Sequence, residues 1–84
     1  MKYYAVFVPS DGYHSLCFDF PVLSYGEDFD KAVESTRSGI VEYIADCKSR
    51  NKPIPEPASY DVVLEDTKNN PDLTDYQIVG IEIE

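Results

Sequence analysis

The chain has 84 residues, which we expect to form one domain, 1–84. Sixteen acidic residues and seven basic ones give a net charge of −9, which argues against direct binding to nucleic-acid phosphates. The same charge favours a basic partner, although it also suits a small protein that only needs to stay soluble.

The sequence carries neither a secretory signal pattern nor an apolar stretch near the ~20 residues of a transmembrane helix. We therefore expect a cytoplasmic protein without membrane contact. The two cysteines, Cys17 and Cys47, lie in apolar segments. They are too few for a disulfide scaffold or a zinc site, so both are expected to be free core residues.

The N-terminal third predicts three short strands. The segment 2–8 is rich in aromatic and β-branched residues, which is typical of a strand. A turn over 9–12 ends in Asp-Gly, a strong hairpin signal. The returning strand covers 13–20, and a short third strand covers 22–25, just before Gly26.

A long amphipathic helix is the strongest prediction, in the segment 26–50 with Asp28 as N-cap. Gly39 lowers its helix propensity but allows a strand to approach closely. The apolar stripe recurs at intervals of three and four residues. It consists of Phe29, Ala32, Val33, Thr36, Ile40, Tyr43, Ile44 and Cys47.

The last third reads as a mixture of connectors and short elements. Three prolines make 51–57 an extended connector. The segment 59–66 predicts a short helix capped by Ser59, with a strand as the alternative. A polar loop over 68–74 then leads to a closing strand over 76–83.

These elements predict an α+β fold, a two-layer β-β-β-α-β arrangement with one long helix on one face of an antiparallel sheet. The first and last strands are apolar on both faces, and a single long helix covers only one face. We expect the other face or an edge strand to meet another chain, as a homo-dimer or tetramer. The alternative is that 51–75 folds back over it.

Few residues suit catalysis, so we expect no enzyme, no cofactor and no metal site. His14 is the only histidine. In a strand it points away from the face that carries Cys17, which weakens a Cys–His pair. Among the acids of the first third, Asp19 has no obvious structural role. The sequence has no phosphate-binding glycine loop and no HExxH or CxxC motif.

Three segments resemble the HicB antitoxins, partners of the HicA mRNA interferase toxins. MKYYAVFVPSDGYHSLCF is similar to the family's N-terminal hairpin, and residues 26–32 (GEDFDKA) resemble its Gly-led helix start. The segment 53–57 (PIPEP) resembles its P-x-P-x-P run. The loop between Phe20 and Gly26 is shorter than usual. Many HicB proteins continue into a helix-turn-helix or ribbon-helix-helix DNA-binding domain, to which the resemblance does not extend, so we do not expect operator binding.

The resemblance implies a partially degenerate RNase H-like fold without nuclease activity. It also implies a function: binding a small basic HicA-type toxin and covering its catalytic histidine and RNA-binding surface. Charge would speed the encounter, while buried aromatic side chains would supply affinity. On expected exposure and charge, the candidate contact residues are Tyr13, Asp19, Phe20, Tyr25, Glu27, Asp30, Glu34 and Glu42.

Two other functions remain open. An acidic inhibitor that mimics nucleic acid needs carboxylates in rows, whereas Lys31, Arg37 and Lys48 interrupt them here. A residual magnesium-dependent nuclease needs Asp19 to converge with a helix carboxylate such as Glu34 or Glu42.

Overall fold

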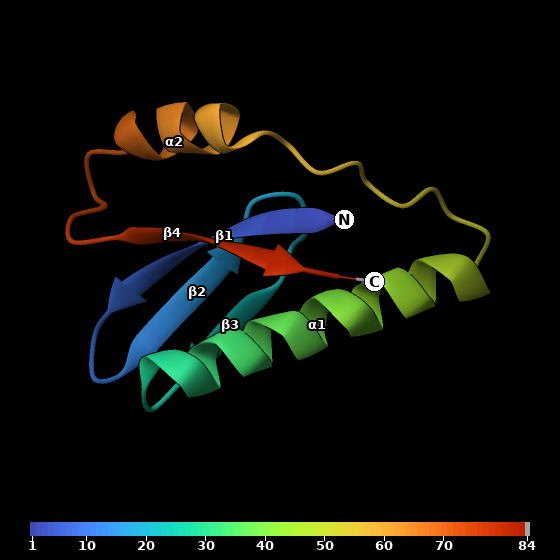
Figure 1. The fold of residues 1–84 in the computed structure, drawn as a ribbon, viewed down its shortest axis with the longest axis horizontal. Helices are drawn as coiled ribbons and strands as arrows, with labels where there is room; N and C mark the ends of the chain where they lie inside the picture. The colour runs from blue at the N-terminus through green and yellow to red at the C-terminus, as the bar shows by residue number, and fades with distance from the viewer. Residues whose placement is uncertain (84) are drawn as a thin grey trace.

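The computed structural model describes residues 1–83, which form a four-stranded sheet with a helix on either side (Figure 1). Neighbouring strands are all antiparallel, in the order β3-β2-β1-β4. The expected α+β class is confirmed. The elements are β1 (Lys2–Pro9), β2 (Tyr13–Cys17), β3 (Leu23–Gly26), α1 (Phe29–Ser49), α2 (Tyr60–Lys68) and β4 (Gln77–Glu82).

The first hairpin has the turn that its sequence predicts. Pro9 pairs with Tyr13, and both Asp11 (φ 50°) and Gly12 (φ 108°) adopt left-handed backbone angles. Asp and Gly tolerate that conformation better than other residues do. The hairpin therefore fixes β2 beside β1, while β4 pairs along the other edge of β1.

Helix α1 begins where its capping signal lies. The Asp28 side chain accepts a hydrogen bond from the Lys31 backbone N–H at 2.9 Å. Gly39 faces the segment before β3, because a Cβ at this position would lie 2.7 Å from Cγ1 of Val22. The close approach that we expected of a strand is thus made by a side chain just before β3. The buried stripe consists of Ala32, Thr36, Ile40, Ile44 and Cys47.

The main core lies between the sheet and α1. Tyr3, Ala5 and Phe7 of β1 point into it and are fully buried. One polar contact crosses it, since Ser15 Oγ and Thr36 Oγ1 are hydrogen-bonded at 2.6 Å. The cysteines are free and buried, as expected. Burial raises the pKa of the Cys17 thiol above its ordinary value, so the thiol stays protonated at neutral pH.

Helix α2 packs on the opposite face of the sheet, where the sequence analysis left a choice between self-coverage and association. Ser59 caps it by accepting a hydrogen bond from Val62 N–H, as predicted. The Tyr60 ring lies 5.6 Å from that of Tyr4 on β1, and Val63 is fully buried. The fold therefore has the two expected layers and a partial third layer, which α2 forms. Neither helix within 1–83 is long and apolar enough to cross a membrane.

Candidate functional site

Helix α2 leaves β2 and β3 uncovered on its face of the sheet. Leu16 and Leu23 are 48% and 77% exposed and lie opposite each other in the strand register. Tyr25 is 47% exposed and pairs with His14, whose ring centroid lies 4.9 Å away. Exposed apolar side chains that adjoin in this way are unusual on a small monomer and mark candidate interaction sites.

A groove runs between this patch and the C-terminal end of α2, and we call it the β2–α2 groove. Its volume is about 210 Å³. Thr67 is buried in it, and its hydroxyl donates to the Val63 carbonyl oxygen at 2.7 Å, so the side chain's polar group is already satisfied. The groove is therefore largely apolar. Its main lining residues are Val6, Val8, Leu16, Phe18, Leu23 and Leu73.

The charge is unevenly divided along the chain. Residues 53–84 contain eight of the sixteen acids but only one of the seven bases, which accounts for −7 of the net charge of −9. Asp66 lines the groove, and Asp61 and Glu65 lie on the adjoining surface of α2. Within residues 1–83, the ion pairs lie on α1 and the residues that flank it. They are Glu27–Lys31, Glu34–Arg37 and Asp46–Arg50.

Three of the eight predicted contact residues are partly or fully buried and have structural roles. Phe20 is 3% exposed, with its ring 4.6 Å from Tyr3 and 5.0 Å from Tyr43, so the expectation that it is exposed was wrong. Strand β2 ends at Cys17, and the chain beyond it turns Phe20 into the core. Asp19 accepts hydrogen bonds from Ala58 N–H at 3.2 and 3.3 Å and so anchors the proline connector.

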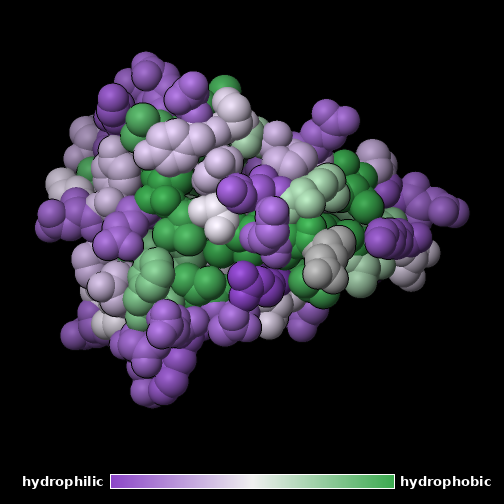
Figure 2. Space-filling view, viewed as in Figure 1, coloured by the Kyte–Doolittle hydropathy of each residue, from purple (hydrophilic) through white to green (hydrophobic). Residues whose placement is uncertain are grey.

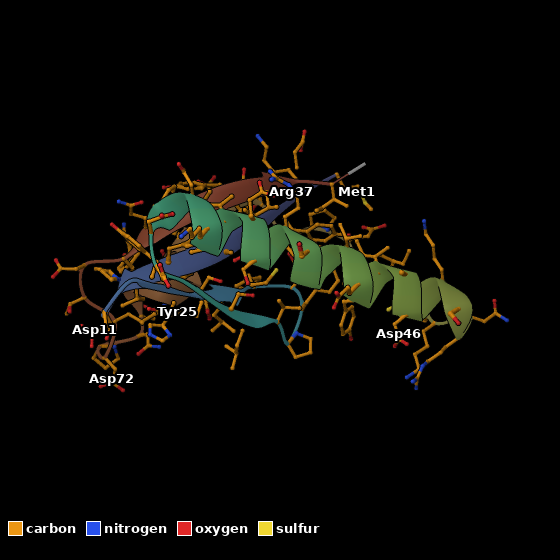
Figure 3. All side chains as sticks on the ribbon, turned by 90° about the horizontal axis from the view of Figure 1, so that it is seen from below. Met1, Asp11, Tyr25, Arg37, Asp46 and Asp72 are labelled. Atoms are coloured by element: carbon orange, nitrogen blue, oxygen red, sulfur yellow. The ribbon has the colours of Figure 1, made fainter. Side chains whose placement is uncertain are left out.

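The third is Tyr13, a partly buried residue whose ring packs edge-on against Phe29 at 5.5 Å. The other predicted residues are exposed but do not form one site. Tyr25 belongs to the α2 face, and its hydroxyl donates to the Asp11 carbonyl oxygen (Figure 3). Four acids lie along or just before α1, and their partner-binding role stays a prediction. They are Glu27, Asp30, Glu34 and Glu42.

The aliphatic part of the exposed patch was not predicted from the sequence. Leu16 and Phe18 lie on the same side of the chain as His14. Leu23 is the first residue of a strand of only four residues, too short to show an alternating pattern. The alternation of side chains along 13–18 predicts that residues 14, 16 and 18 share a face. It does not predict that α2 leaves that face uncovered.

The side chains offer little for catalysis. His14 and Cys17 lie on opposite faces of β2, as expected, because Cys17 is in the main core and His14 is exposed. Residues 1–83 contain no group of three or more His, Cys, Asp or Glu side chains placed to hold a metal ion. Asp19, which the nuclease alternative requires, is hydrogen-bonded to the backbone of Ala58.

No protein-family model and no curated protein matches the sequence. Two solved structures from Burkholderia pseudomallei align with the whole chain. One is the N-terminal domain of the antitoxin HicB, with a TM-score of 0.79, 19% identity, and coverage of 100% of this chain and 99% of that one. The chain has the fold of this HicB domain.

The second structure is the antitoxin HicB itself. It has a TM-score of 0.82 and 21% identity, and the match covers 100% of this chain and 64% of that chain. The chain thus spans less than two thirds of the antitoxin's length. The resemblance inferred from the hairpin, the helix start and the proline run is confirmed at the level of the fold.

Proposed function

We propose that this chain is an antitoxin-like binding protein that sequesters and neutralises a small basic HicA-type toxin. The observation that carries the proposal is the match of the entire chain to the N-terminal domain of the antitoxin HicB. The net charge of −9 supports it, because an RNA-cleaving protein needs a basic surface to hold its substrate.

Neutralisation in this proposal is steric and electrostatic. The chain would cover the toxin's catalytic histidine and its RNA-binding surface, and it would perform no reaction itself. Opposite charges would accelerate association, and the exposed apolar side chains of β2 and β3 would be desolvated in the complex. The outer edges of β3 and β4 also present unpaired strand backbone, which supports self-association as a dimer or tetramer.

The nucleic-acid mimic is less well supported. On α1, where the acids are most regularly spaced, Glu34 lies 2.6 Å from Arg37 and Asp46 lies 3.0 Å from Arg50. Paired carboxylates present less negative charge than a row of phosphates does. The antitoxin-like proposal does not need such a row.

RNA cleavage by a HicA-type toxin from the same genome tests the proposal. Addition of an equimolar amount of the folded chain is expected to abolish cleavage, whereas an unrelated protein of similar size and charge is expected to leave it unchanged. Cleavage that persists in a large excess of the chain would contradict the proposal. Magnesium-dependent cleavage by the chain alone would instead support the nuclease alternative.

A further inference from the structure

We propose that the β2–α2 groove is the docking site for apolar side chains of a basic partner segment. For the partner's identity this inference rests on the proposed function, and it specifies which surface holds the partner. The segment would place one or two large apolar side chains over Leu16 and Leu23. Its lysines or arginines would face the acids of α2.

The size of the groove fits this kind of anchor. A volume of about 210 Å³ exceeds the ~150 Å³ of an apolar cavity that accommodates benzene. Val6 and Val8 of β1 are among the residues that line it, and α2 flanks it. A Leu, Met or Phe side chain could therefore be buried without rearrangement of the fold.

The groove is also fixed in shape before a partner arrives. The Tyr25 hydroxyl donates to the Asp11 carbonyl oxygen, which ties β3 to the first turn. The His14 ring packs against that of Tyr25 from the neighbouring strand, with an angle of 54° between the ring planes. On the other side, Tyr4 packs against Tyr60 and holds the start of α2 on the sheet. A preformed site loses less conformational entropy on binding.

The charge around the groove determines which sign of charge a partner segment should carry. Asp66 lines it, and the described lining includes no lysine or arginine. Another cleft lies between α1 and the end of β4, and its charged lining residues are Arg37, Lys48 and Glu82. Arg37 extends toward the β4 side of the molecule (Figure 3). A basic segment is therefore favoured at the groove, where the only charged lining residue described is an acid, over the α1–β4 cleft, where two bases accompany one acid.

A second copy of the chain fits the groove less well. A symmetric contact through this face would bring two acidic α2 helices together, each with Asp61, Glu65 and Asp66. Like charges facing one another oppose such a contact. Figure 2 shows an apolar band between the two helices on the face toward the viewer.

Two synthetic peptides test the groove without any toxin. Both place the same leucines and phenylalanine on one face of a short helix, and they differ only in carrying lysines or glutamates on the other face. In ¹⁵N–¹H spectra of the folded chain, the lysine peptide is expected to shift the amide signals of Leu16, Leu23 and Thr67. The glutamate peptide is expected to shift none of them.

Substitutions then separate the apolar contact from charge. Leu16→Asp and Leu23→Asp each add a negative charge, which by itself would strengthen attraction to the lysine peptide. We nevertheless expect each to weaken binding by about tenfold or more, because a buried Leu contact is lost. Val41→Asp is the matched control, since Val41 is 48% exposed like Leu16 but lies on α1. It should leave the affinity nearly unchanged.

Leu23 lies on an edge strand and is 77% exposed, so Leu23→Asp keeps the test valid even if Leu16→Asp prevents folding. Binding of both peptides, binding of neither, or perturbations spread along α1 would overturn the inference. The toxin assay separates the two proposals. If the toxin is inhibited equally by wild type, Leu16→Asp and Leu23→Asp, the groove assignment fails and the antitoxin-like function stands.

Discussion

Replacement of Tyr3 by alanine is expected to lower the free energy of unfolding by about 3–5 kcal/mol. The Tyr3 side chain is 0% exposed, and its ring packs against Phe20 with centroids 4.6 Å apart. Its hydroxyl donates to the Pro55 carbonyl oxygen at 2.8 Å, joining β1 to the proline connector. Because a domain of this size has a total stability of roughly 4–13 kcal/mol, the variant should lose a large share of its stability.

Tyr3→Phe provides the matched control for this prediction. It keeps the ring and removes only the hydroxyl, so it is expected to cost about 1 kcal/mol, the usual net value of one hydrogen bond. Urea denaturation followed by circular dichroism measures both variants. If Tyr3→Ala were no less stable than Tyr3→Phe, the position of Tyr3 at the centre of the core would be wrong.

Substitution of Gly26 by alanine is the second large effect that we expect. Gly26 ends β3, and a Cβ there would lie 2.2 Å from the Ala32 backbone nitrogen and 2.6 Å from the Lys31 carbonyl carbon. Backbone atoms of a capped helix cannot yield as a side chain can, so the first turn of α1 would have to move away from the sheet. We expect a loss of about 3 kcal/mol, at the upper end of the range for overpacking.

Gly80→Ala is the control because it makes the same chemical change in another strand. The nearest atom to its Cβ would be Cδ of Lys2 at 2.7 Å, which belongs to a long flexible side chain. The stability should therefore change by less than about 1 kcal/mol. Thermal unfolding of the two variants compares them directly, and equal losses would show that the α1–β3 contact is not as tight as described.

The local signals were sufficient to predict most of the elements. Asp28 and Ser59 cap the two helices because each side chain bonds to a backbone N–H three residues further on. Asp11 and Gly12 likewise form the first turn from their own backbone preferences. In each case the determining contacts lie within a few residues, so the sequence contains them directly.

The candidate site depended on contacts between distant segments. The position of α2 is fixed partly by the packing of Tyr60 on Tyr4, which no local pattern contains. Phe20 is buried, not exposed as expected, because β2 ends at Cys17 and not at residue 20. Leu16 and Leu23 stay exposed because α2 does not extend over β2 and β3. The area of sheet that α2 covers is set by tertiary packing and could not be predicted from the sequence.

The most direct test of the antitoxin-like function is calorimetric titration of the folded chain with a HicA-type toxin whose catalytic histidine has been replaced. We expect a saturable complex whose affinity falls as salt is added, because opposite charges contribute to its formation. An absence of binding at low salt, with the chain shown to be folded, would contradict the function proposed here.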